Sequence, residues 1–216
     1  MTRTQRTAAH PAARPEAAGA TPRRGEGARC FALLLRGVNV GRGNSLPMAT
    51  LRAMLEELGC SDVATYVQSG NAVFRTTLAG SELAAAIEGR LAEHMGRPVP
   101  TALRTGAELD AVIAGNPFAG VATNGSSLCV TFLSVTPEPA ELAALRDRDW
   151  APDLLHVATT EIYSWYPDGQ GRSRLATELA RLPVRGAATT RNWNTVTKLR
   201  ELLSAIEAGP PGSSPG

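Results

Sequence analysis

The pattern of apolar positions changes abruptly at residue 30, where a polar segment gives way to short apolar runs. Residues 31–35 form a continuous apolar run that ends before Gly37, which is typical of a buried central strand. Apolar residues then recur at the spacing i, i+3, i+4, i+7 of an amphipathic helix, at Leu51, Met54, Leu55 and Leu58. Gly59 follows as a stop signal, so we expect a helix that packs one face on the sheet.

The rest of the first half predicts a complete set of elements. Two strands, a helix and a strand are expected at residues 63–67, 72–76, 81–95 and 99–104. The two strands are joined at Gln68-Ser69-Gly70-Asn71, where a glycine supplies the positive φ of a tight hairpin, and Ser81 is the expected N-cap of the helix. The order strand, helix, strand, strand, helix, strand predicts a ferredoxin-like (βαββαβ) subdomain over residues 30–105.

A similar order follows in the second half. Residues 106–126 are expected to form a connecting helix and loop. A strand, a helix, two strands and a helix are then predicted at residues 128–135, 136–146, 154–158, 161–166 and 173–182. A last helix from about Trp193 to Ile206 has one apolar face. The fold class is therefore α+β, with a second ferredoxin-like subdomain and a C-terminal helix over residues 127–207, although the residues of the two halves do not match at a fixed period.

The two ends of the chain lie outside this pattern. Residues 1–29 are rich in Arg, Ala and Pro and carry a net charge of +4 in a chain whose total is +2, so the remaining 187 residues are net −2. We expect residues 1–29 and 208–216 to be disordered tails, because their composition cannot form a core. Three other interpretations of residues 1–29 remain open, namely a nucleic-acid-binding arm, a transit-like peptide and a start codon placed too far upstream.

Composition excludes several classes of protein. The chain has 216 residues, of which 43% are apolar, which is enough to form one or two cores. Its three cysteines are far apart and lack C-x-x-C spacing, so neither a disulfide framework nor a zinc site is indicated. No apolar run approaches the roughly 20 residues of a membrane helix, and no secretory signal is present. We expect a cytoplasmic protein without a metal or cofactor, and the oligomeric state stays open.

The main candidate for chemistry is Lys198, the only lysine among 22 basic residues. An ammonium group is compact and can lose its proton, which an arginine does not do, so a single retained lysine points to a site that needs it. Lys198 falls at the edge of the apolar face of the last helix, within a polar segment that also holds Arg191, Asn192, Asn194 and Thr195. The alternative is that Asn192 or Asn194 only caps the helix and that Lys198 is a solvated surface charge.

Other polar segments add to this candidate site. The glycine-rich loop after the first strand begins at Arg36 and matches neither known phosphate-binding fingerprint. Two further polar segments, residues 68–71 and 168–174, are each also explained as a turn when taken alone, and the aspartates around Trp150 are interpreted as a solvated connection. The ligand-binding residues predicted from all the segments are Arg36, Asn39, Gln68, Ser69, Asn71, Arg172, Ser173, Arg191, Asn192, Asn194, Thr195 and Lys198.

Five separated blocks carry a family resemblance. They are residues 34–41 (LLRGVNVG), 46–48 (LPM), 65–71 (TYVQSGN), 116–118 (NPF) and 189–198 (TTRNWNTVTK). Together they resemble the bacterial "domain of unknown function 1697" family (DUF1697) over residues 30–204. The resemblance implies a small cytoplasmic α/β protein of two ferredoxin-related subdomains and implies no activity. The chain departs from the family near Asn44, at Ser45, where members often carry a lysine, and at Arg174, where members carry Ser-Lys-Leu instead of Ser-Arg-Leu.

Three functions remain open from the sequence. The first is a binding module for a phosphorylated or nucleotide-like ligand in a cleft between the subdomains, because amide, hydroxyl and arginine groups suit an anion. RNA is a minority case of it, since the body is not basic and the aromatic signature of RNA-recognition strands is missing. The second is a small-molecule enzyme that uses Lys198 as base or nucleophile. The third is a module that binds a protein partner without any small ligand.

Overall fold

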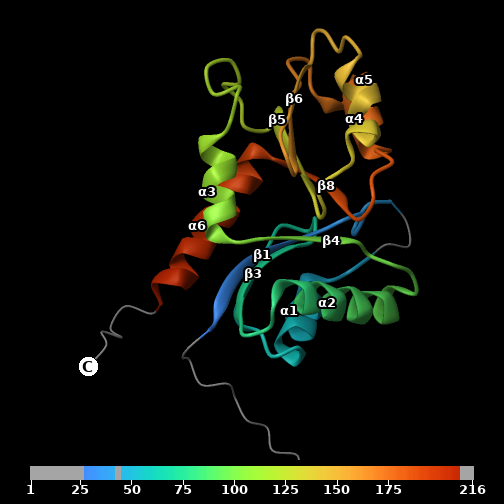
Figure 1. The fold of residues 1–216 in the computed structure, drawn as a ribbon. Helices are drawn as coiled ribbons and strands as arrows, with labels where there is room; N and C mark the ends of the chain where they lie inside the picture. The colour runs from blue at the N-terminus through green and yellow to red at the C-terminus, as the bar shows by residue number, and fades with distance from the viewer. Residues whose placement is uncertain (1–26, 42–44, 210–216) are drawn as a thin grey trace, which may run out of the picture.

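The protein is an α+β structure built around two four-stranded antiparallel sheets (Figure 1). It is represented by a computed structural model that describes residues 27–41 and 45–209. The predicted tails therefore lie almost entirely outside the described residues, as do residues 42–44 of the glycine-rich loop. Within the described ranges, no helix is long and apolar enough to cross a lipid bilayer.

The first sheet contains four strands in the order β2-β3-β1-β4. Two helices belong to the same stretch of chain, and a third follows it. In chain order these elements are β1 (Arg29–Leu35), α1 (Met48–Glu57), β2 (Ser61–Tyr66), β3 (Asn71–Thr76), α2 (Gly80–Met95), β4 (Thr101–Arg104) and α3 (Gly106–Ala114). The predicted elements of the first half are thus all present.

The second sheet has the corresponding order, β6-β7-β5-β8. Its elements are β5 (Leu128–Leu133), α4 (Pro139–Arg146), β6 (Leu154–Val157), β7 (Glu161–Trp165), the 3-10 turn η1 (Gln170–Arg172), α5 (Arg174–Ala180), β8 (Ala188–Asn192) and α6 (Trp193–Ala208). The sequence pattern missed β8, because this strand is short and largely polar. Arg191, which the sequence analysis places only in a polar segment, therefore lies on a strand.

Three apolar cores lie between the layers of helices and sheets. Helices α1 and α2 cover one face of the first sheet, and α4 and α5 cover the outer face of the second (Figure 1). The middle core joins the other faces of both sheets to α3 and α6, with Leu34, Val130 and Leu199 all fully buried in it. The apolar stripe of α6, predicted from the sequence, is therefore what fills the space between the two sheets.

Local sequence signals explain several element boundaries and miss others. Thr105 and Glu108 form a capping box at the start of α3, and Ser173 caps α5 through the Ala176 amide. Ser81, in contrast, is not the N-cap of α2, because the helix begins one residue before it and Ala79 occupies the cap position without a side-chain bond.

The turn between β2 and β3 also differs from the prediction. Asn71 belongs to β3, so the turn spans residues 67–70, and Val67 and Gly70 take positive φ angles of 49° and 75°. A β-branched residue rarely adopts this conformation, which is strained without a glycine. Asn39 in the neighbouring loop has a φ of 54°, but its amide nitrogen donates to the carbonyls of Leu46 and Gln68, and its amide oxygen accepts from the Leu46 amide.

Two buried arginines join the halves. Arg104, on β4 of the first sheet, is 6% exposed and donates to the carbonyls of Leu133 at 2.8 Å and Thr160 at 3.2 Å in the second half. The Glu161 carboxylate lies 2.9 Å from the same guanidinium. Leu133 ends β5, and Thr160 and Glu161 lie at the turn into β7.

Arg191, on β8 of the second sheet, makes the reverse connection. It donates to the Leu35 carbonyl at the end of β1, to the Ser69 carbonyl in the turn before β3, and to Asn71 at the start of β3. The two arginines occupy equivalent positions. Arg104 is paired with Ala32, three residues before the end of β1, and Arg191 is paired with Val130, three residues before the end of β5.

The strained turn generates a stability prediction. Val67→Gly is expected to stabilise the protein by about 1 kcal/mol, because glycine adopts a positive φ without a Cβ clash and Val67 is 48% exposed. Asn39→Gly is the matched variant, and it is expected to destabilise the protein by about 1–3 kcal/mol through its lost hydrogen bonds. Urea denaturation followed by circular dichroism measures both. Equal effects of the same sign would contradict this interpretation.

Candidate functional site

The predicted site residues nearest the junction of the halves form a saturated polar cluster around Arg191. A guanidinium has five N–H donors, and here each one is used. The acceptors are the Asn71 side chain at 2.5 Å, the Thr189 hydroxyl at 2.7 Å, and the carbonyls of Thr190 at 2.8 Å, Leu35 at 2.7 Å and Ser69 at 2.9 Å. Arg191 therefore has no donor left for a ligand in this arrangement.

The charge of Arg191 is not balanced by a carboxylate in this cluster. The residue is only 8% exposed, and burial lowers its pKa to about 10. At the equivalent position around Arg104, the acceptor is the Glu161 carboxylate, whereas around Arg191 it is the neutral Asn71 amide. Arg191 still carries its charge at neutral pH, and it joins the two halves through neutral acceptors alone.

Arg36, Asn39 and Gln68 lie around the same end of β1. The amide of Asn39 bridges its own loop to the Gln68 carbonyl at 2.6 Å, which fixes the glycine-rich loop against the β2–β3 turn. Arg36 donates to the Ala180 carbonyl at the end of α5, at 3.0 Å. The structure thus brings these three residues near Asn71 and Ser69, as parts of loops that bind one another.

The residues at the start of α6 are arranged differently. The Asn192 side chain caps the helix by accepting from the Thr195 amide at 2.9 Å. Asn194 is exposed and lies against the backbone of Gly125. Lys198 is 38% exposed and its ammonium lies 2.7 Å from the Glu201 carboxylate, one turn along the helix. Lys198 therefore forms a helix-surface ion pair, and among the described residues its ammonium makes no hydrogen bond to another predicted site residue.

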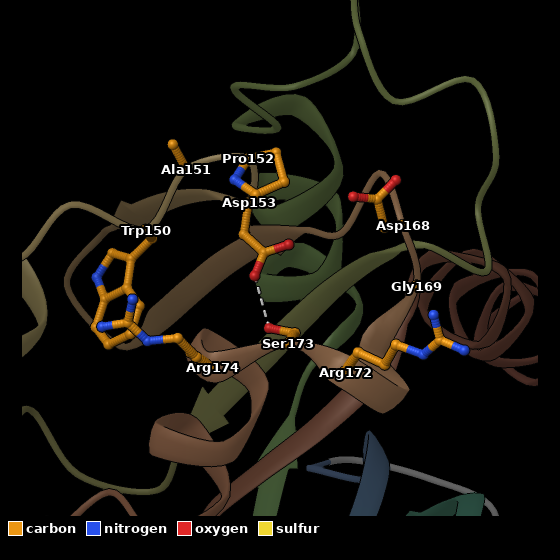
Figure 2. Close-up of a pocket in the computed structure, with 9 residues that line it drawn as sticks. All are labelled: Trp150, Ala151, Pro152, Asp153, Asp168, Gly169, Arg172, Ser173 and Arg174. Atoms are coloured by element: carbon orange, nitrogen blue, oxygen red, sulfur yellow. Dashed lines mark hydrogen bonds between the residues drawn. The ribbon is translucent and has the colours of Figure 1, made fainter.

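Arg172 and Ser173 line a cavity of about 510 Å³ in the second half. Two segments form its walls, residues 150–153 between α4 and β6 and residues 168–174 around η1 (Figure 2). The volume lies within the range of small-molecule sites, about 300–1,000 Å³. Two of the predicted site residues thus line a cavity of a size that suits a small molecule.

Hydrogen bonds hold both walls in place. The Ser173 hydroxyl donates to the Asp153 carboxylate at 2.7 Å, which ties one wall to the other (Figure 2). The Trp150 indole donates to the Leu145 carbonyl at 2.8 Å, and the Arg148 guanidinium lies 5.2 Å from the indole ring. On the other wall, Gln170 donates to the Cys129 sulfur. These contacts hold the walls of the cavity without using the charged groups of Asp168, Arg172 or Arg174.

Three charged side chains of the cavity are unpaired. Among the residues that the structure describes, Asp168, Arg172 and Arg174 make no side-chain hydrogen bond or ion pair. This contrasts with the saturated guanidinium of Arg191. Unpaired charges on a preformed wall are available to a ligand without first breaking internal bonds.

No reactive thiol is available beneath the cavity. Cys129 is fully buried, and this burial raises its pKa to about 12. Tyr166 is also buried, and burial raises the pKa of its phenol, with smaller contributions from Cys129 and Asp153. Both groups are neutral at physiological pH. The chemistry offered by the cavity is thus charge pairing and hydrogen bonding, without an activated cysteine nucleophile.

Four polar or aromatic residues of the cavity lie outside the predicted ligand-binding set: Trp150, Asp153, Asp168 and Arg174. The sequence pattern favours a solvated connection for the first two and a turn for the segment that holds the other two. The available signal was the spacing of aspartates around a tryptophan, but it could not show that this segment faces residues 168–174. That pairing depends on the fold of the second half.

These features define an α+β protein of two similar halves with a charged cavity in the second half. A family model described as "Protein of unknown function (DUF1697)" matches residues 29–163, which is more than half of the chain. The chain belongs to this family, in agreement with the resemblance found in its sequence blocks.

One solved structure supports the fold. The chain is similar to conserved bacterial protein SP0830 from Streptococcus pneumoniae, with 23% identity and a TM-score of 0.69 over 82% of this chain and 99% of that chain. At this identity the likeness supports the fold alone. No curated protein shows significant sequence similarity to the chain.

The saturated cluster predicts that an exchange between arginine and lysine affects stability strongly at residue 191 and weakly at residue 198. Arg191→Lys is expected to lower the free energy of unfolding by about 2–4 kcal/mol, because three ammonium donors cannot serve five buried acceptors. Lys198→Arg is the matched exchange on the neighbouring helix, and it is expected to change stability by less than about 0.5 kcal/mol. Urea denaturation measures both. A neutral Arg191→Lys would show that the cluster does not join the halves.

The buried thiol predicts a pH dependence of stability. Its pKa rises from 9.0 in the unfolded chain to about 12 in the fold, so its contribution is constant below pH 9 and is lost as the pH rises from 9 to 12. Cys129→Ser removes this titration, and the variant is expected to lose about 1.4 kcal/mol less per pH unit than the wild type in this range. Denaturation at a series of alkaline pH values compares the slopes. Parallel slopes would contradict the prediction.

Proposed function

We propose that the protein binds a small phosphorylated or nucleotide-like ligand in the cavity formed by residues 150–153 and 168–174. The single observation that carries this proposal is the pair of unpaired guanidinium groups of Arg172 and Arg174 on the wall of a preformed cavity. Arginine binds phosphate through charge-assisted and often bidentate hydrogen bonds, each worth about 1.5–3 kcal/mol.

We favour the cavity of the second half over the junction between the halves as the binding site. At the junction, the donors of Arg191 and the amide of Asn39 are used by the protein itself. An anion would have to replace these bonds, whereas Arg172 and Arg174 have no bond to replace. Of the ligand-binding residues predicted from sequence, Arg172 and Ser173 therefore carry the proposal, and Arg174 joins them.

The other hypotheses have less support. The enzyme hypothesis depends on Lys198, whose ammonium lies at the surface beside Glu201 and is not desolvated. RNA binding remains a minority case, since the described cavity is small and the chain without residues 1–29 is net negative. A cytoplasmic location is our inference from Cys30, Cys60 and Cys129, which are all unpaired.

We also interpret each half as a ferredoxin-like subdomain, over residues 30–105 and 127–207. The shared antiparallel strand orders, β2-β3-β1-β4 and β6-β7-β5-β8, support this interpretation. The equivalent positions of Arg104 and Arg191 support it further, because each arginine donates to the end of the central strand and to the hairpin turn of the opposite half. Such reciprocity is the arrangement expected of a duplicated unit that pairs with its own copy.

Binding of simple phosphates tests the proposal. Inorganic phosphate and adenosine monophosphate are the probes, titrated into the full chain by isothermal calorimetry. Arg172→Gln and Arg174→Gln are each expected to weaken binding by about tenfold, since each removes a charge-assisted bond. Arg52→Gln, an exposed arginine on α1, is the control and is expected to have no effect. Affinities that do not depend on Arg172 or Arg174 would refute the proposal.

A further inference from the structure

The charged side chains of the cavity sum to zero. Arg172 and Arg174 contribute two positive charges, and Asp153 and Asp168 contribute two negative charges to the same lining. A ligand that is only anionic gains from the arginines and loses to the carboxylates at similar range. The charge pattern therefore matches a ligand that carries charges of both signs.

Asp153 is the central element of this pattern. One of its carboxylate oxygens accepts from the Ser173 hydroxyl, and the other accepts no hydrogen bond from the residues that the structure describes. Asp153 is half-buried, and Ser173 is buried beneath it. The second oxygen has no hydrogen bond from the described residues, including the two arginines of the lining, so it is available to a cationic group of a ligand.

The arrangement separates the two signs in space. Figure 2 shows the Asp153–Ser173 pair in the middle of the cavity, with Trp150 and Arg174 on one side and Asp168 and Arg172 on the other. A guanidinium thus flanks the central carboxylate on each side. A short ligand can place a cationic group at Asp153 while its anionic group reaches one of the arginines.

We propose that the ligand is a small phosphate ester that also carries a primary ammonium group, with the ammonium bound at Asp153 and the phosphate at Arg172 or Arg174. This inference rests on the proposed function, because it assumes that the cavity binds phosphate. A nucleotide offers neutral ribose hydroxyls to Asp153, which satisfy hydrogen bonding but do not offset the repulsion between carboxylate and phosphate. The aminated ester satisfies both requirements.

Two probes of similar size separate these alternatives. O-phosphoethanolamine carries an ammonium group, and glycerol 3-phosphate carries hydroxyls in its place. Calorimetric titration into the full chain is expected to give at least tenfold tighter binding of phosphoethanolamine. Asp153→Asn keeps an acceptor for Ser173 but removes the charge. In this variant the ratio of the two affinities is expected to fall below threefold, mainly because phosphoethanolamine binds more weakly.

Controls distinguish the effect of Asp153 from a general loss of structure. Asp147→Asn changes an exposed aspartate outside the cavity and is expected to leave the ratio unchanged. Asp168→Asn changes the second carboxylate of the lining, which is exposed, and serves as an independent test if Asp153→Asn does not fold. Far-UV circular dichroism and the unfolding temperature check the fold of each variant.

The outcomes separate this inference from the proposed function. If both probes bind in an Arg172- or Arg174-dependent way and phosphoethanolamine is not preferred, the inference is overturned and the proposed function stands. The inference is also overturned if the preference survives in Asp153→Asn or, where that variant does not fold, in Asp168→Asn. If neither probe binds in a way that depends on the arginines, the proposed function fails, and the inference fails with it.

Discussion

The reciprocal exchange of two buried arginines is the interaction on which the arrangement of the protein depends. The Arg104 side chain, on β4 of the first sheet, donates hydrogen bonds to the end of β5 and to the turn before β7. The Arg191 side chain, on β8 of the second sheet, donates to the end of β1 and to the turn before β3. Each guanidinium donates to the carbonyl group that ends a central strand of the opposite sheet, at Leu133 and at Leu35, and the Leu35 carbonyl accepts from the Thr189 hydroxyl as well. The two sheets and the middle core between them are thereby held in one orientation.

This constraint determines which polar residues remain available for binding. The residues around Arg191 resemble a ligand site in composition, yet their donors and acceptors are used by one another. The cavity of the second half is the opposite case, because its walls are held by Ser173, Trp150 and Gln170 and its arginines have no partner within residues 27–41 and 45–209. Residue type alone therefore does not reveal whether a polar side chain is used by the protein itself or stays unpaired.

Much of the fold could be predicted from local signals, and the failures have identifiable causes. The apolar spacing in α1 and α6 was sufficient to locate those helices, and of the two caps predicted for α6, Asn192 or Asn194, the structure has Asn192. Strand β8 was missed because its alternation of buried and exposed residues uses threonine and arginine, which carry no hydrophobic signal. The cavity was missed because Asp153 and Arg172 are distant in sequence and meet only when β6, β7 and α5 have formed.

The sequence by itself determined the family, the order of the elements other than β8, and the apolar faces of helices such as α1 and α6, because these follow from family-specific blocks, periodicities of 2 and 3.6 residues and short-range caps. The tertiary structure alone decided the roles of the charged residues. The sequence alone does not distinguish the roles of Arg104, Arg172 and Arg191. Packing buries the first and last among carbonyl groups and leaves Arg172 at an open cavity, since burial and hydrogen-bond partners depend on contacts between segments far apart in the chain.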